Sequence, residues 1–134
     1  MRRKALKLCL ASAVTAAVAF GMAGTADAAT GSATGDHFEV IGNNNPENAG
    51  GRYAYICNYQ SGPNDFYFWV WDNQWGSYAA LIDGSGTETW GKVHVWVAAG
   101  TCTGFAVGAG NGHSIEVFGQ SSGYTNATQS IAWG

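Results

Sequence analysis

One stretch of this chain, residues 65–75, is more apolar and aromatic than any other and has the sequence DFYFWVWDNQW. In a β-strand, successive side chains point to opposite faces. The set Phe66, Phe68 and Val70 therefore lies on one face, which has no polar side-chain atoms and suits a core. The other face carries three rings that each hold one polar atom, and such atoms need a partner or water.

This second face has two readings. Three bare rings of ~150–250 Å² each would expose a patch on the order of 500 Å², close to the largest apolar patch of a soluble monomer. The strand is then either a central strand buried on both faces or a platform that binds a partner. The candidate binding residues of such a platform are Tyr67, Trp69, Trp71, Trp75, His94 and Trp96.

The first 28 residues have the pattern of an export signal. A basic segment precedes an apolar, Ala-rich run from residue 8 to about residue 23, and Ala26-Asp27-Ala28 fits the small-x-small cleavage pattern. No second hydrophobic span follows, so we expect a secreted protein that is not retained in the membrane. The basic residues are Arg2, Arg3, Lys4 and Lys7.

The remaining 106 residues are enough for one domain. We expect residues 29–35, which are Ala, Thr, Gly and Ser, to form a flexible arm, and residues 36–134 to form a single β domain. This part has two strong bases, Arg52 and Lys92, against eight acids, for a net charge of −6. Such a charge excludes nucleic acid as a plausible partner.

Short alternating stretches predict an all-β fold. Residues 92–97 (KVHVWV) alternate most clearly, with Val93, Val95 and Val97 on the core face. About seven to eight short strands, separated by turn formers, predict an antiparallel β-sandwich or small barrel. The turn Ser61–Asn64 predicts a hairpin between the strands at 52–59 and 66–71.

Two cysteines, Cys57 and Cys102, remain after the export signal. In an exported chain such a pair predicts a disulfide. It would close a loop of 45 residues, and the loss of chain entropy in the unfolded state then stabilises the fold by about 4 kcal/mol. An intermolecular bridge or a metal site are the alternatives.

No stretch has the motif of a catalytic or metal site. His37, His94 and His113 are too scattered for a metal signature, and no serine lies in a Gly-x-Ser-x-Gly sequence. The acids that flank the aromatic stretch, Asp65 and Asp72, are expected to be solvated turn residues. We therefore predict no catalytic residue, no metal, no cofactor and no enzymatic activity.

Several short motifs follow one another along this chain: Gly35–Ile41 (GDHFEVI), Gly51–Tyr55 (GRYAY) with Gly62, Gly91–Val95 (GKVHV) and Gly100–Cys102 (GTC). Their order resembles the spore-associated protein A family of small secreted actinomycete proteins. Thr34 stands where that family has its first cysteine, and Lys92 where it has a proline. The resemblance implies a secreted, surface-associated protein without assigned chemistry.

Three functions fit these features. The first is a secreted, non-catalytic protein of the cell surface or spore envelope, whose partner is wall or spore-surface material. The second is a carbohydrate-binding module that uses the aromatic platform. The third is a secreted hydrolase inhibitor that presents an exposed loop, for which residues 83–90 are the candidate. In each case we expect a monomer.

Overall fold

The computed structural model describes residues 29–44 and 52–133. Within these residues the chain forms twelve β-strands and no helix, so no helix there could span a membrane. The expected export signal, residues 1–28, lies outside the described residues. The strands are β1 (Ala29–Gly35), β2 (Phe38–Asn44), β3 (Arg52–Asn58), β4 (Asn64–Asp72), β5 (Ser77–Tyr78), β6 (Ala80–Ile82), β7 (Glu88–Trp90), β8 (Val93–Val97), β9 (Cys102–Gly108), β10 (His113–Ser121), β11 (Tyr124–Ala127) and β12 (Ile131–Trp133).

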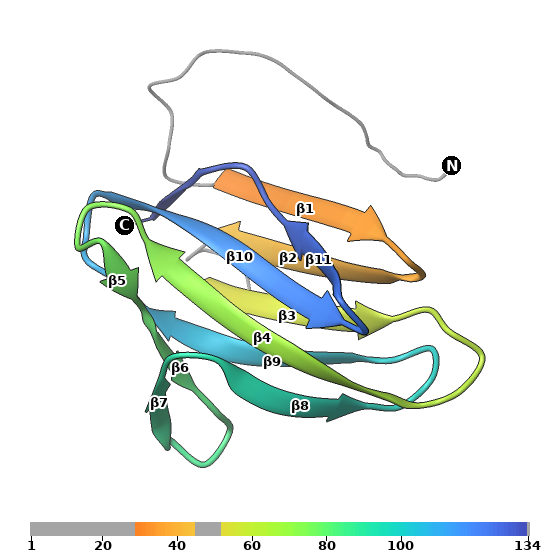
Figure 1. Cartoon of the computed structure of the whole chain (residues 1–134). Helices are drawn as coiled ribbons and strands as arrows, with labels where there is room; N and C mark the ends of the chain where they lie inside the picture. Colours follow the sequence, from red (N-terminus) through yellow and green to blue (C-terminus); the bar gives the residue numbers. More distant parts are fainter. Residues whose placement is uncertain (1–28, 45–51, 134) are drawn as a thin grey trace.

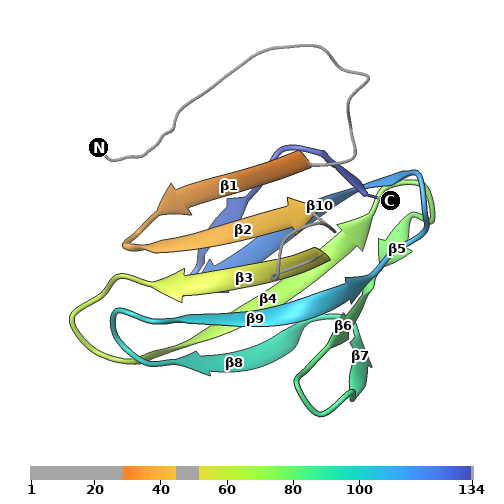
Figure 2. The ribbon, with the colours of Figure 1, turned by 180° about the vertical axis from the view of Figure 1, so that it is seen from behind.

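The strands form two antiparallel sheets that stack as the layers of a sandwich (Figure 1). The first sheet has the order β1-β2-β3-β9-β6-β7. The second has the order β11-β10-β4-β5, and β8 and β12 add to β4 and β10 respectively. The same two layers are visible from behind in Figure 2. The predicted all-β sandwich is confirmed, and the alternative of a closed barrel is wrong.

The core lies between the sheets and contains the face predicted from the aromatic stretch. Phe66, Phe68 and Val70 of β4 are at most 1% exposed. Val95 and Val97 of β8 are also buried, while Val93, at the start of that strand, is only half-buried. The first sheet contributes Phe38, Val40, Ala54 and Ile56 to the same core.

A glycine in β10 allows the two sheets to approach closely at the centre of this core. Gly119 lies opposite Phe68 in the second sheet. A Cβ at this position would lie 2.6 Å from Val40 Cγ1 and 3.0 Å from Ile56 Cδ1, both in the first sheet. Any larger residue would therefore push the sheets apart or displace these side chains.

The predicted flexible arm is wrong, because residues 29–35 form the edge strand β1. All seven residues pair with β2, from Ala29 opposite Asn44 to Gly35 opposite Phe38. Asp36 and His37 make the tight turn with positive φ angles of 51° and 62°, as a type I′ turn requires. Since β1 has no large apolar side chain, its hydrophobic pattern could not predict a strand.

The predicted hairpin between the strands at 52–59 and 66–71 is also wrong. β3 belongs to the first sheet and β4 to the second, so the connection crosses from one layer to the other. The buried Asn58 side chain holds this crossing, since its Nδ2 donates to Gly62 O and Val97 O, both at 3.0 Å, and its Oδ1 accepts from Gln60 N. In separate sheets, the apolar faces of both strands can cover each other.

Twelve strands exceed the seven to eight that the sequence predicts. Besides β1, two strands lack an alternating apolar pattern: β5, which has two residues, and β11, which has the polar sequence YTNA. Asn126 of β11 is buried and its Nδ2 donates to Gly35 O and Phe38 O. This amide therefore fastens β11 to the turn between β1 and β2.

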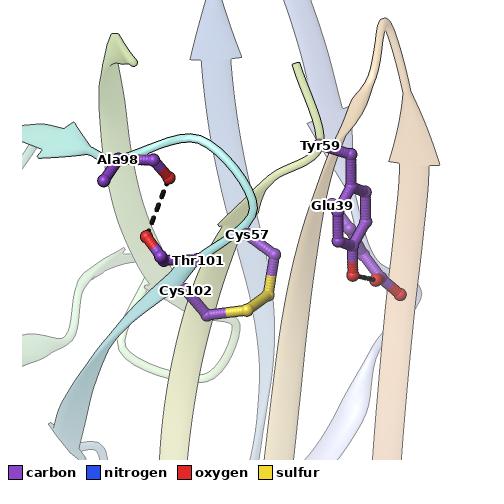
Figure 3. Close-up of a disulfide and its surroundings, with 6 residues drawn as sticks. All are labelled: Glu39, Cys57, Tyr59, Ala98, Thr101 and Cys102. Atoms are coloured by element: carbon purple, nitrogen blue, oxygen red, sulfur yellow. Dashed lines mark hydrogen bonds between the residues drawn. A yellow bond between two sulfur atoms is a disulfide. The ribbon is translucent and has the colours of Figure 1, made fainter. Parts of the chain in front are cut away.

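The predicted disulfide between Cys57 and Cys102 is present, and it joins directly opposite residues of β3 and β9. It lies on the outer face of the first sheet (Figure 3). Nearby, Tyr59 donates its hydroxyl to Glu39 at 2.7 Å, and Thr101 Oγ1 donates to Ala98 O in the turn before β9. The bridge therefore fastens two neighbouring strands of the first sheet together.

Candidate functional site

The outer face of the second sheet brings together five of the six candidate platform residues. Alternation along β4 places Tyr67, Trp69 and Trp71 on this face, opposite the buried set. β8 pairs with β4 and adds His94 opposite Tyr67 and Trp96 opposite Asp65. No strand of the described residues forms a third layer over this face, since Tyr67 is 49% and Trp96 62% exposed. Burial of this whole face, the first of the two readings, is therefore wrong.

Trp69 is held in this face by neighbours on both sides. The Phe118 ring of β10 stacks on it with centroids 5.2 Å apart and an interplanar angle of 3°. From the side of β8, Lys92 Nζ lies 4.3 Å from the Trp69 ring centroid, which is cation–π geometry. Because these two contacts occupy its ring faces, Trp69 supports the surface and offers little of its ring to a ligand.

On this face, the side chains near the start of β4 are the most exposed. Tyr67 and His94 stack with centroids 5.0 Å apart and an interplanar angle of 22°. His94 Nε2 also lies 3.9 Å from Asp65 Oδ1, and both side chains are more than half exposed. Gln120 of β10 lies opposite Tyr67. We call the group formed by Asp65, Tyr67, His94, Trp96 and Gln120 the Tyr67–Trp96 patch.

Trp71 and Trp75 are not part of this patch. Trp71 lies further along β4 and packs edge-on against Tyr78 of β5, with centroids 5.4 Å apart. Trp75 follows β4 in the turn and contacts Trp90 of β7, with centroids 6.4 Å apart, and the ring of His113. The predicted grouping of Trp75 with the platform is therefore wrong, because the turn after β4 places its ring against Trp90 and His113.

The carboxylate of Asp72 fixes the turn that carries Trp75. Contrary to the expectation of a solvated turn acid, Asp72 is fully buried. Its oxygens accept hydrogen bonds from the backbone N–H groups of Gln74, Trp75 and Gly110 at 3.0–3.1 Å, and lie 2.8–2.9 Å from His113 Nδ1. Burial alone would raise the pKa of Asp72, but these hydrogen bonds hold it below its ordinary value.

Among the described hydrogen bonds, the His113 ring is joined to Asp72 and to no hydroxyl or thiol. The hydroxyl of the neighbouring Ser114 instead accepts from Asn73 Nδ2 at 3.0 Å. A nucleophile activated by histidine would need to lie within hydrogen-bond reach of that ring. The pair therefore ties the β4–β5 turn to the turn between β9 and β10.

A second turn, between β6 and β7, is exposed and internally hydrogen-bonded. Asp83 Oδ1 accepts from Ser85 N at 2.9 Å, Ser85 Oγ at 2.6 Å and Thr87 N at 3.1 Å. The hydrogen bonds from Ser85 and Thr87 lower the pKa of Asp83. This turn lies within the loop that the sequence indicates for an inhibitor, and Trp90, 58% exposed, follows it.

Among residues 29–44 and 52–133, no three His, Cys, Asp or Glu side chains cluster in a way that could hold a metal ion.

No known protein family, curated protein or solved structure matches this chain.

The resemblance to spore-associated protein A therefore stays a prediction. Phe118, Trp90 and His113 also take part in the two aromatic groups described above, although none of them was among the six predicted platform residues. Phe118 could have been found from alternation, since residues 114–118 (SIEVF) place it on the opposite face from Ile115 and Val117.

Proposed function

We propose that this protein is a secreted, non-catalytic protein of the cell surface or spore envelope, and that it binds a neutral polysaccharide through the Tyr67–Trp96 patch. The observation that carries the proposal is the exposure of two aromatic rings beside polar groups on one sheet face. A rigid sheet keeps such side chains in a fixed arrangement. This favours binding because little conformational entropy is lost when the ligand binds.

The chemistry of the patch suits a sugar chain. The apolar faces of pyranose rings can lie on Tyr67 and Trp96, whose rings offer area at low cost in conformational entropy. Asp65, His94 and Gln120 can exchange hydrogen bonds with hydroxyl groups at the rim of the same surface. The net charge of −6 after residue 28 favours a neutral polymer over nucleic acid or an anionic wall polymer.

Two carboxyl groups, those of Asp72 and Asp83, favour binding without catalysis. A glycosidase uses two carboxyl groups and needs a raised pKa on the one that acts as the general acid. The pKa values of Asp72 and Asp83 are both lowered, and Asp72 is enclosed by hydrogen bonds. Neither group is suited to donate a proton to a leaving group.

Export is proposed from the sequence of residues 1–28. The disulfide between Cys57 and Cys102 is compatible with an extracellular location, because disulfides persist in oxidising compartments. On this basis the natural ligand is a polysaccharide of the wall or spore surface.

A sedimentation assay tests the proposal. The purified protein is mixed with cell walls, spores, chitin or cellulose, and the bound fraction is measured over a range of concentrations. We expect Trp96→Ala and Tyr67→Ala each to weaken binding by about tenfold or more, as truncation does at a hot spot. Tyr53→Ala is the matched control, because Tyr53 is 37% exposed on the outer face of the other sheet.

Binding to none of these materials would refute the proposal. Equal weakening by the Tyr53 control would also refute it, because the contact would then not depend on the second sheet.

Inhibition of a hydrolase is the second candidate function. It is favoured by the turn at Asp83, whose three hydrogen bonds hold an exposed loop in one conformation. Rigid loops bind proteases and related enzymes well because they lose little entropy on binding. A panel of proteases and amylases tests it: inhibition by the wild type that is lost in Asp83→Ala would support this function, and no inhibition would exclude it for the enzymes tested.

A further inference from the structure

The outer strand of the second sheet, β8, has a free long edge. On one side it pairs with β4, from Asn64 opposite Val97 to Phe68 opposite Val93. On its other side, no strand among the described residues pairs with it. It runs along the rim of the front layer in Figure 1 and is visible at the same rim from behind in Figure 2.

The backbone groups of His94 and Trp96 point to this free edge. In an antiparallel ladder the N–H and C=O groups of alternate residues point to the same side. Ala79 N donates to Val70 O at 2.9 Å, so the backbone N–H and C=O groups of Val70 point to the side where β5 and β8 lie. The backbone groups of Phe68 and Phe66 then point to the same side and bond those of Val93 and Val95 in β8. The backbone groups of His94 and Trp96 therefore point away from β4, and no described backbone hydrogen bond reaches them.

This edge lacks the usual protection against strand pairing. Natural edge strands are blunted by charged residues, proline or bulges. β8 has the sequence VHVWV, with no proline and no Lys, Arg, Asp or Glu. Lys92 lies just before the strand, and its Nζ is engaged over the Trp69 ring.

We infer that the free edge of β8 pairs with β8 of a second copy of this chain, antiparallel and centred on Val95. In this register His94 lies opposite the partner's Trp96, and Val93 lies opposite the partner's Val97. Both His94–Trp96 pairs then exchange backbone hydrogen bonds, and all five residues of each strand overlap. A two-fold axis of this kind makes one patch complementary to itself.

The side chains fit this pairing on both faces. On the inner face valines meet valines, and the half-buried Val93 gains cover from the partner's Val97. On the outer face the imidazole of His94 meets the indole of the partner's Trp96, which is an aromatic cross-strand pair. An unrelated peptide would gain the backbone hydrogen bonds but not this match on both faces.

The dimer joins two second sheets into one continuous sheet. Its outer face would carry two Tyr67–Trp96 patches side by side, and both would face the same way. The pairing does not depend on the proposed ligand, although two patches on one face would raise the avidity for a polymer. This inference departs from the monomer expected from the sequence, which cannot reveal which strand keeps a free edge.

A matched pair of substitutions at His94 tests the dimer. His94→Pro removes the outward N–H group, and proline is tolerated at such edge positions because that group does not bond β4. His94→Ala removes the same side chain and keeps the N–H group. Sedimentation velocity over a range of concentrations should show a dimer for the wild type, and His94→Pro should dimerise at least about tenfold more weakly than His94→Ala, because two hydrogen bonds per dimer are lost.

A monomer at all concentrations for the wild type would overturn the inference. Equal dimerisation of the two variants would also overturn it, because the contact would then not use this N–H group. Amide hydrogen exchange on the wild type gives a second measurement that does not depend on the folding of a variant. The amides of His94 and Trp96 should become protected as the concentration rises, and fast exchange of both at every concentration would refute the pairing.

Tyr67→Ala separates this inference from the proposed function. It removes a ring of the patch that lies on β4, away from the free edge. We expect it to dimerise like the wild type even if it no longer binds polysaccharide.

Discussion

Replacing the buried Asp72 by asparagine keeps the size of the side chain but exchanges one acceptor oxygen for an amide that can only donate. One carboxylate oxygen accepts the N–H groups of Gln74 and Trp75, and the other accepts that of Gly110. In either orientation of the new amide, at least one buried backbone N–H group loses its acceptor. That loss costs ~1–3 kcal/mol, and the remaining hydrogen bonds weaken because they no longer involve a charge.

We therefore expect Asp72→Asn to lower the free energy of unfolding by about 3–5 kcal/mol at pH 7. The measurement is urea unfolding followed by tryptophan fluorescence with the disulfide intact, compared at equal m-values. Asp83→Asn is the matched control, since Asp83 makes a similar set of hydrogen bonds in an exposed turn. Its unfolding midpoint should stay close to that of the wild type.

The pH dependence follows from the lowered pKa of Asp72. A carboxyl group with a lower pKa in the folded state stabilises the fold above its unfolded-state pKa of about 3.9, and this contribution is lost as the pH falls through the folded-state value. The difference between wild type and Asp72→Asn should be complete at pH 7 and should shrink below about pH 4. A loss under about 1 kcal/mol at pH 7, or an equal effect of Asp83→Asn, would show that this carboxylate does not hold the turn.

Three further predictions concern the core, the disulfide and the tryptophans. Phe68→Ala should cost ~3–5 kcal/mol in urea unfolding, because this buried ring also stacks on Phe105, and a cost under about 1 kcal/mol would contradict the core assignment. The oxidised protein should have no free thiol and run as a monomer on a denaturing, non-reducing gel, and reduction should lower the stability by up to about 4 kcal/mol; an unchanged melting temperature after reduction would contradict this. In single-tryptophan variants, iodide should quench Trp96 more than Trp69, and equal quenching would mean that Phe118 and Lys92 do not cover the Trp69 ring.

The core face could be predicted because alternation along one strand is a local signal. Phe66, Phe68 and Val70 alternate with larger, partly polar rings, and this separation assigns the faces without knowledge of any neighbour. The same signal does not exist for β1, whose residues are small and which forms only because β2 offers it an edge. It also could not assign β3 and β4 to different sheets, because a turn sequence does not determine which layer the next strand joins.

The candidate site could be predicted in part for the same reason. The outward phase of β4 and β8 identifies Tyr67 and Trp96, but exposure depends on the strands that lie beside them. Trp69 is covered because Phe118 arrives from a strand almost fifty residues later in the chain. Asp72 is buried because Gly110 and His113 come from a distant turn, and nothing near Asp72 in the sequence indicates them.

The place of β4 in its sheet also determines the order in which the chain can complete its structure. Both long edges of this strand are taken by segments that follow it, since β5 and β8 pair along one side and β10 along the other. During synthesis, the second edge of β4, the most aromatic segment of the protein, therefore stays unpaired until β10 has been made. Such non-local pairing slows folding, and until it is complete it leaves an aggregation-prone strand edge exposed. Until β10 has been made, the backbone N–H and C=O groups along this edge of β4 have no strand partner and can pair with another chain.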